Sequence, residues 1–117
     1  MTTDSAKHPT HQLLVDRDEL TAALRQIAAF KRRKAVLAKG SRVRLAYANG
    51  ELVISMPEVT IRVAGQGTWP AEVCTDSAWV WMLAKFPPSA NPVAFIYEGG
   101  KIRVGTTVVP ILRVTSP

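Results

Sequence analysis

The 117-residue sequence is poor in cysteine, in aromatic residues and in long apolar runs. Its one cysteine, Cys74, has no second cysteine with which to form an internal disulfide, and no Cys or His residues are spaced as metal ligands. No apolar run reaches the roughly 20 residues that a membrane-spanning helix needs. Residues 1–12 are polar and lack the apolar core of a signal peptide. We therefore expect a cytoplasmic protein with no membrane partner.

Patterns of catalytic and cofactor-binding residues are missing as well. The nine acidic residues are scattered and give no evident pair for acid–base chemistry. Neither of the glycine-rich stretches, 65–67 and 99–100, precedes the Lys-Ser/Thr of a phosphate-binding loop. His8 and His11 have no further ligands nearby, and Cys74 is expected to be a buried apolar residue. We expect no catalytic residue, metal or cofactor; an enzyme on another α+β fold is the weakest interpretation.

Acidic residues are scarce in one segment, and this gives the chain its excess of positive charge. The net charge of the chain is +6. Residues 17–44 carry nine Lys or Arg against two acidic residues, whereas residues 45–117 carry five of each sign. A localised basic segment is typical of a protein that binds a phosphate-rich partner. The same residues would also favour solubility, or stabilise the C-terminal end of a helix.

Apolar periodicity and turn residues predict a strand, a helix and three more strands in the first half of the chain. The helix begins after Asp16, whose side chain would cap the first turn, with Glu19 three residues later. Its apolar stripe predicts an end near residues 30–32. Asn49-Gly50 is the strongest hairpin signal, because both residues tolerate positive φ. The expected strands cover residues 11–15, 41–48, 51–55 and 59–64.

The second half of the chain repeats this order. Thr75 or Asp76 would cap a second helix, which Pro87-Pro88 ends. The apolar stripe of that helix is expected to comprise Trp79, Met82, Leu83 and Phe86. The expected strands cover residues 72–74, 93–97, 101–104 and 106–114.

Two segments of the chain are alike in detail. Residues 45–54 and 95–104 each contain an apolar run through a Tyr, a turn that ends in Gly and a second alternating run. A unit used twice restricts the fold more than a single motif does. The sequence therefore predicts a flexible tail at 1–11 and one α+β domain at 12–115, with two helices packed on an antiparallel sheet. Its two β-α-β-β-β repeats would cover about 12–64 and 71–114.

The repeated unit resembles one domain of the DNA sliding clamps, and the bacterial replicative clamp in particular. Residues 13–24, LLVDRDELTAAL, look like the first strand and helix of that domain, and residues 50–54, GELVI, look like the turn and strand that follow. Residues 79–87 and 93–104 look like its second helix and closing hairpin. This resemblance covers residues 11–114. It implies a DNA clamp fold and the role of a processivity factor in DNA replication.

In the clamp family, six such domains form a ring, and their helices carry basic side chains towards the phosphates of duplex DNA. The resemblance therefore implies sequence-independent binding of double-stranded DNA through the two helices, each contact displacing condensed counterions. The expected DNA-binding residues are Arg25, Lys31, Arg32, Arg33, Lys34, Lys39 and Lys85. A clamp subunit has two or three such domains and this chain has one, so a ring would need six copies.

The alternative is a protein-interaction module of the same fold, which engages a replication protein or another protein without binding DNA. Trp81 would be either an exposed anchor for a partner or a cover over the sheet. The apolar segment 108–112 would serve as an edge strand for self-association, with Pro110 limiting its pairing. The expected interface residues are Trp81, Val108, Val109 and Ile111. A homo-oligomer formed through such edges is more readily a dimer than a hexamer.

Overall fold

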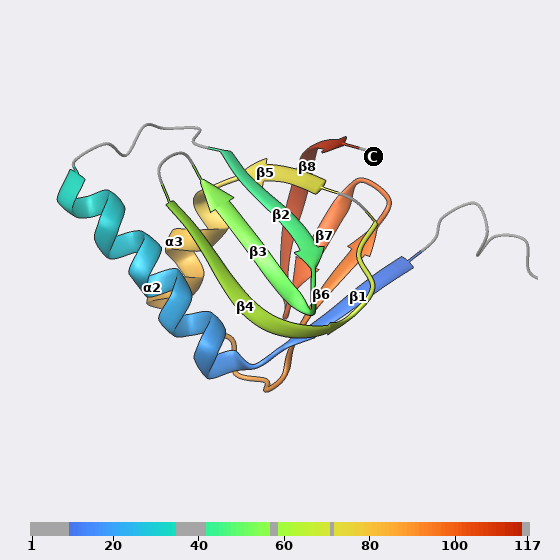
Figure 1. Cartoon of the computed structure of the whole chain (residues 1–117), viewed down its shortest axis with the longest axis horizontal. Coiled ribbons are helices and arrows are strands. Elements are labelled where there is room, and N and C mark those ends of the chain that lie inside the picture. The colour runs from blue at the N-terminus through green and yellow to red at the C-terminus, as the bar shows by residue number, and fades with distance from the viewer. Residues whose placement is uncertain (1–9, 35–41, 57–58, 71, 116–117) are drawn as a thin grey trace, which may run out of the picture.

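The computed structural model describes residues 10–34, 42–56, 59–70 and 72–115, without the side chains of residues 10, 30–34 and 113–115. Within these ranges, the helices and strands follow the order that the sequence predicts (Figure 1). They are β1 (Thr10–Val15), α2 (Arg17–Lys34), β2 (Arg42–Ala48), β3 (Glu51–Met56), β4 (Val59–Gly67), β5 (Glu72–Asp76), α3 (Ala78–Lys85), β6 (Val93–Glu98), β7 (Lys101–Val104) and β8 (Thr107–Thr115). The prediction of an α+β fold with two helices and an antiparallel sheet is confirmed.

The strands close into a barrel in the order β1-β4-β3-β2-β5-β8-β7-β6, and β6 returns to β1. Two strands change partners part-way along their length. In β4, residues 59–64 pair with β3 and residues 65–67 pair with β1. In β8, residues 107–110 pair with β7, and the pairing with β5 begins at Ile111. These two strands therefore form the corners at which the sheet folds back on itself.

The order of the strands around the barrel is the same for both halves of the chain. Exchanging β1, β2, β3 and β4 for β5, β6, β7 and β8 leaves the cyclic order unchanged. In each half, the first strand pairs with the last strand of its own half and with the second strand of the other half. The two halves are thus interlocked, and neither completes the barrel alone.

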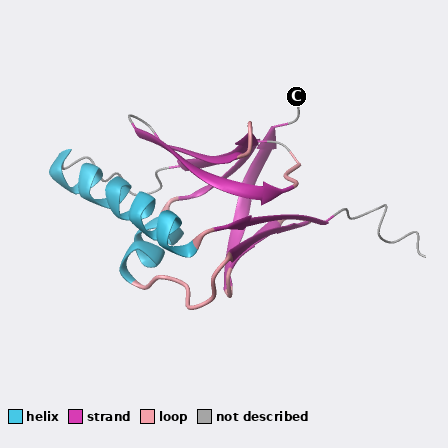
Figure 2. Ribbon diagram, turned by 60° about the horizontal axis from the view of Figure 1, so that its bottom comes forward, coloured by secondary structure: helices cyan, strands magenta, loops and turns pink. Residues whose placement is uncertain are grey.

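Both helices lie on the same side of the barrel, next to each other (Figures 1 and 2). Leu20, Leu24 and Ile27 of α2 are fully buried, which is what their helical spacing predicts. The apolar core extends from these residues into the barrel, where Phe95 is the largest fully buried side chain. Trp79 of α3 packs edge-to-face on Phe95, with ring centroids 6.2 Å apart. The core therefore holds the helices against the strands.

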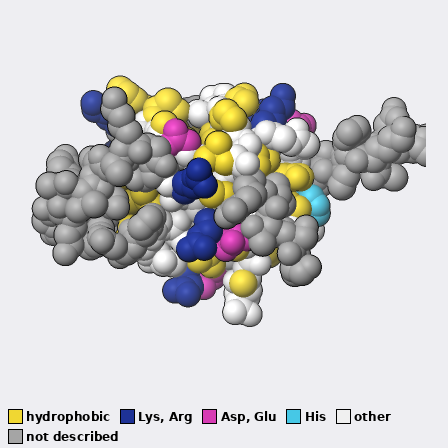
Figure 3. All heavy atoms as spheres, turned by 90° about the horizontal axis from the view of Figure 1, so that it is seen from above, with side chains coloured by type: hydrophobic (Ala, Val, Ile, Leu, Met, Phe, Trp, Pro, Cys, Tyr) yellow, Lys and Arg dark blue, Asp and Glu magenta, His cyan; other side chains and the backbone are white. Residues whose placement is uncertain are grey.

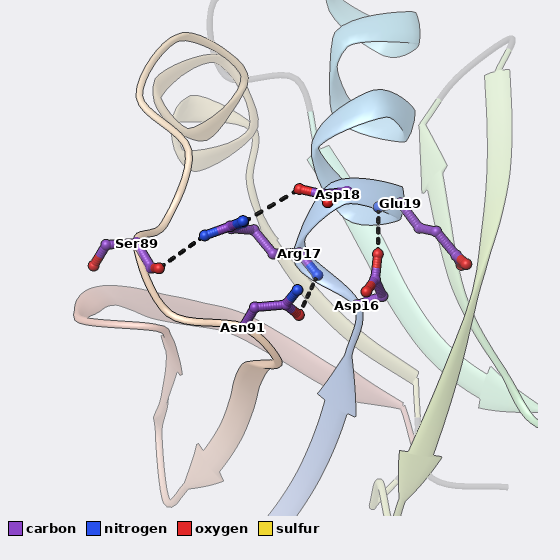
Figure 4. Close-up of polar contacts among 6 residues, drawn as sticks. All are labelled: Asp16, Arg17, Asp18, Glu19, Ser89 and Asn91. Atoms are coloured by element: carbon purple, nitrogen blue, oxygen red, sulfur yellow. Dashed lines mark hydrogen bonds and ion pairs between the residues drawn. The ribbon is translucent and has the colours of Figure 1, made fainter.

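The start of α2 is fixed by two sets of polar contacts (Figure 4). The Oδ2 atom of Asp16 accepts a hydrogen bond from the backbone N–H of Glu19 at 3.0 Å, so the predicted cap is confirmed. The backbone N–H of Arg17 donates to Oδ1 of Asn91 at 3.0 Å, and its Nη1 donates to the carbonyl of Ser89 at 2.9 Å. These bonds tie the first turn of α2 to the segment that follows α3.

Several expected boundaries differ from the structure. β1 begins at Thr10, so residues 10 and 11 belong to a strand rather than to the expected tail. α2 continues to Lys34, past the expected end near 30–32, because Lys and Arg are good helix formers and are favoured near a helix C-terminus. Ser77 precedes α3 in place of Thr75 or Asp76. The hydroxyl of Thr75 instead accepts a hydrogen bond from Nε1 of Trp79 at 2.8 Å.

The apolar stripe expected for the second helix is also only partly right. Trp79 and Leu83 are buried, but Met82 is 41% exposed and Phe86 is 67% exposed. The helix ends at Lys85, and the two prolines that follow prevent it from continuing. Phe86 therefore leaves the helical path and does not reach the core.

Candidate nucleic-acid interface

The two helices meet at a shallow open depression of about 580 Å³. One wall comes from α2 and the other from α3, although the segments are about 60 residues apart in the sequence. The lining residues are Arg25, Ala28, Ala29, Trp81, Ala84 and Lys85. The structure thus brings together three residues that the sequence singled out for separate reasons: Arg25 and Lys85 for DNA, and Trp81 for a protein interface.

Arg25 joins the two helices directly. Its Nε atom donates a hydrogen bond to the carbonyl oxygen of Ala84 at 3.1 Å. The last carbonyl groups of a helix have no partner within the helix, and a cation is stabilised there by the helix dipole. The alanines on both sides of the contact leave room for this close approach. Arg25 therefore caps the C-terminal end of α3, a role that the sequence did not reveal.

The depression is positively charged. A guanidinium group has five N–H donors, and the bond to Ala84 uses only one of those on Arg25. Arg25 and Lys85 are both exposed. Among the residues that the structure describes, neither forms an ion pair with an acidic side chain. Two cations from different helices are thus available at one place to an anionic ligand.

The rest of the expected DNA-binding set continues from this depression along the chain. Lys31, Arg32, Arg33 and Lys34 form the last four residues of α2, but their side chains lie outside those described. Lys39 lies outside the described residues altogether. The sequence of α2 contains six basic and two acidic residues, and both acidic residues are in its first turn. The positive charge of the helix therefore increases towards its C-terminal end.

Basic residues on the strands are arranged differently. Arg42 and Arg44 are exposed on β2, where they alternate with the buried Val43 and Leu45. Arg62 and Arg103 form ion pairs with Glu51 and Glu98, at 4.0 and 3.0 Å respectively. On the face shown in Figure 3, basic side chains lie among acidic and hydrophobic ones and do not gather in one cluster. The strands offer a mixed surface, in contrast to the depression between the helices.

A second, apolar depression of about 440 Å³ lies on the other side of α3. It is lined by Ala78, Trp79 and Met82 of α3, by Asp76 before the helix, and by Thr107, Val108, Val109, Pro110 and Leu112 of β8. Val108 and Leu112 are 55% and 53% exposed. The sequence pointed to Val108 but missed Met82 and Leu112. The alternation of exposed and buried residues along β8 is the signal that selects Leu112.

The expected interface set is corrected in two respects. Val109 is only 5% exposed and belongs to the core, because its side chain points into the barrel between the outward-facing Val108 and Pro110. Ile111 is partly buried against the core, and β8 pairs with β5 from this residue onward, whereas residues 107–110 pair with β7. Trp81 lines the charged depression and is separate from Val108, which lines the apolar one.

Among the described residues, no cluster of side chains suggests a chemical activity. In the described ranges, no three His, Cys, Asp or Glu side chains gather as metal ligands. Cys74 is buried, as expected. No helix within the described part of the chain is long and apolar enough to cross a membrane. Comparisons of the chain with protein-family models, with curated proteins and with solved structures found no match. The function is therefore inferred from the geometry of the two depressions.

Proposed function

We propose that this protein is a non-enzymatic, cytoplasmic, sliding-clamp-like protein that binds the backbone of nucleic acid through the face formed by α2 and α3. The observation that carries the proposal is the meeting of Arg25 and Lys85 at the depression between the two helices. Two cations that line one depression among small side chains suit the phosphates of a closely approaching backbone. The sequence of α2 adds four consecutive basic residues at its C-terminal end.

The arrangement of the strands supports the clamp-like part of the proposal. A clamp domain consists of two β-α-β-β-β units, and the present strand order is unchanged when the two halves of the chain are exchanged. Both helices also lie on one side of the strands, as they do in a clamp (Figure 2). With one such domain per chain, encircling duplex DNA would require self-association into a ring or a partial ring.

The proposal is tested by removing the two cations and measuring how binding depends on salt. The assay is fluorescence anisotropy with labelled duplexes of two unrelated sequences, between 50 and 200 mM NaCl. Each phosphate contact contributes about −0.9 to the slope of log K against log salt. The double variant Arg25→Ala/Lys85→Ala should therefore lose about 1.8 from the slope. Over this range of salt, the affinity of the parent should fall about tenfold more than that of the variant.

A charge-matched control is available on the strands. The variant Arg44→Ala/Lys101→Ala removes the same charge from exposed positions on β2 and β7. It should leave the slope within about 0.3 of the parent value. Arg44 and Lys101 alternate with core residues, so their side chains lie on the outer face of the strands and do not line the depression. An equal loss from both double variants would show that binding reflects only net charge. Absence of duplex binding at 50 mM NaCl would refute the proposal.

A specific observation favours a second candidate function, the protein-interaction module. Met82, Val108 and Leu112 expose apolar surface around one depression, which is unusual for a surface that faces only water. A protein partner or a second copy bound there would bury these side chains. Light scattering with and without duplex distinguishes the candidates. A particle whose mass increases on DNA favours the clamp-like function, and one that is indifferent to DNA favours the module.

A further inference from the structure

Trp81 is an unexpected residue for a surface that touches only phosphates. It lies on α3 one helical turn before Lys85, and it lines the charged depression together with Arg25. Its side chain is partly buried against the core and partly accessible to solvent, and it lines the depression. The phosphates of a duplex gain nothing from an indole ring, because the bases that could stack on it are paired and covered by their neighbours in the helix.

We propose that this depression binds one unpaired base, which stacks on Trp81 while the adjoining phosphates contact Arg25 and Lys85. The ligand class is single-stranded nucleic acid, either free or at a junction with a duplex. This inference rests on the proposed function, since it specifies which form of nucleic acid the same depression prefers. It adds an aromatic contact to the two cationic ones.

The composition of the depression fits this ligand. Proteins that bind single strands without reading sequence combine a positively charged groove with aromatic side chains on which bases stack. Three of the six lining residues of the depression supply the two cations and the aromatic ring, and the other three lining residues are alanines. Small side chains leave the indole accessible from the groove. The volume of about 580 Å³ lies within the usual range of ligand pockets. Charge and shape therefore favour an anionic ligand that carries a flat apolar group.

The other two tryptophans cannot supply this contact. Trp69 donates its Nε1–H to the carbonyl of Leu45 at 3.2 Å and packs edge-to-face on Phe95. Trp79 is 3% exposed and donates its Nε1–H to Thr75. Trp79 is buried and Trp69 is partly buried, and both indole N–H groups are hydrogen-bonded within the protein, so they serve as internal references for any spectroscopic change at Trp81.

The test compares an oligo-dT strand of about 20 nucleotides, a duplex of the same length and a duplex with a single-stranded overhang. The protein variants are the parent, Trp81→Leu, Trp81→Phe and, as a matched control on the same helix, Met82→Ala. Leucine retains the apolar contact with the core but removes the ring. Trp81→Leu should weaken binding of the single strand and of the overhang substrate about fivefold or more, and binding of the duplex less than twofold. Trp81→Phe should restore most of the loss, and Met82→Ala should behave as the parent.

A second measurement uses the unaltered protein and needs a variant only to assign one signal. In a ¹⁵N-correlated spectrum, addition of oligo-dT should shift the indole N–H signal of Trp81, which the Trp81→Phe variant identifies. The signals of Trp69 and Trp79 should stay in place.

The outcomes separate this inference from the proposed function. Duplex binding that depends on Arg25 and Lys85, with no effect of Trp81→Leu on any substrate, would overturn the inference and leave the proposed function standing. Equal weakening of all three substrates by Trp81→Leu would also overturn it, because it would indicate a structural role for the ring. Failure of every substrate to bind would refute both.

Discussion

Arg25 should contribute to the stability of the fold as well as to binding, whereas Lys85 should contribute mainly to binding. The reason is the hydrogen bond from Nε of Arg25 to the carbonyl of Ala84, which joins α2 to the C-terminal end of α3. Lys85 is exposed at the end of the same helix, and the structure gives it no comparable bond among the described residues. Replacing each residue by alanine therefore separates the two roles.

The expected size of the stability effect follows from that single bond. A partly exposed hydrogen bond contributes about 1 kcal/mol, and a cation near a helix C-terminus contributes about 0.3–1 kcal/mol. The slightly better helix propensity of alanine offsets a few tenths of this. We therefore expect Arg25→Ala to cost about 1–1.7 kcal/mol. Unfolding entropies of about 2.1 cal/mol/K per residue give the 117-residue chain about 0.25 kcal/mol/K, so Tm should fall by about 4–7 °C. Lys85→Ala should lower Tm by less than about 3 °C, through the helix dipole alone.

Differential scanning calorimetry of the two variants beside the parent measures these shifts. The measurement should be repeated in 1 M NaCl, because salt screens the interaction with the dipole but leaves the hydrogen bond in place. The difference between the variants should therefore persist at high salt. Equal shifts for Arg25→Ala and Lys85→Ala would mean that the bond between the helices contributes no stability, and that Arg25 is available to ligands in the same way as Lys85.

Two further predictions concern the barrel and the apolar depression. Gly67 has φ of 138°, and a Cβ there would overlap the carbonyl of Gln12, so Gly67→Ala should lower the free energy of unfolding, measured in urea, by about 3 kcal/mol or more. Gly50 has φ of 78° and open space where a Cβ would lie, so Gly50→Ala should cost only about 1 kcal/mol. A similar cost for both variants would refute the close approach of β1 to β4. Val108→Asp should leave Tm within about 2 °C of the parent value, since the side chain is exposed, and should abolish any concentration-dependent rise in mass measured by light scattering; an unchanged rise would exclude the apolar depression as the contact.

The parts of the fold that the sequence predicts are those set by neighbours along the chain. The Asp16 cap depends on four consecutive residues, and the β2–β3 hairpin depends on Asn49 and Gly50, which have φ values of 55° and 78°. Both features are local, and both are confirmed. The order of elements follows from the same local signals, because apolar periodicity and turn residues mark each boundary within a few positions.

The closure of the barrel could not be predicted in this way. It depends on the partner changes in β4 and β8, where a strand leaves one neighbour for another. Gly65 and Pro110 stand at the two changes, as glycine and proline often do at a bend or bulge in a strand. They do not indicate which strand becomes the new partner, because that strand lies far away in the sequence. The same limit applies to segment 108–112, whose apolar sequence does not show which strands lie beside it. The burial of Val109 is different, since alternation along a strand places Val108 and Val109 on opposite faces and so predicts that one of them is buried.

The candidate site shows the same division between local and distant information. The sequence leads to Arg25 and Lys85 through the resemblance to the clamp helices, and to Trp81 through its aromatic character. It does not show that they share one depression, because that depends on how α2 docks against α3. Nor does it show the hydrogen bond from Arg25 to Ala84, because the acceptor is a backbone carbonyl, which every residue has. The contact between α2 and α3 therefore brings Arg25, Lys85 and Trp81 together in one site.

The position of α3 between the two depressions bears on whether the two candidate functions exclude each other. Successive residues leave a helix about 100° apart, so Trp81 and Met82 point to different sides of α3. The charged and apolar depressions consequently share no lining residue. Nucleic acid bound beside Trp81 would leave Val108 and Met82 accessible to a protein or to a second copy. Val108→Asp should therefore leave DNA affinity unchanged, and Trp81→Leu should leave self-association unchanged. A variant that alters both properties would indicate a displacement of α3 as a whole, because that helix is the one element that the two depressions have in common.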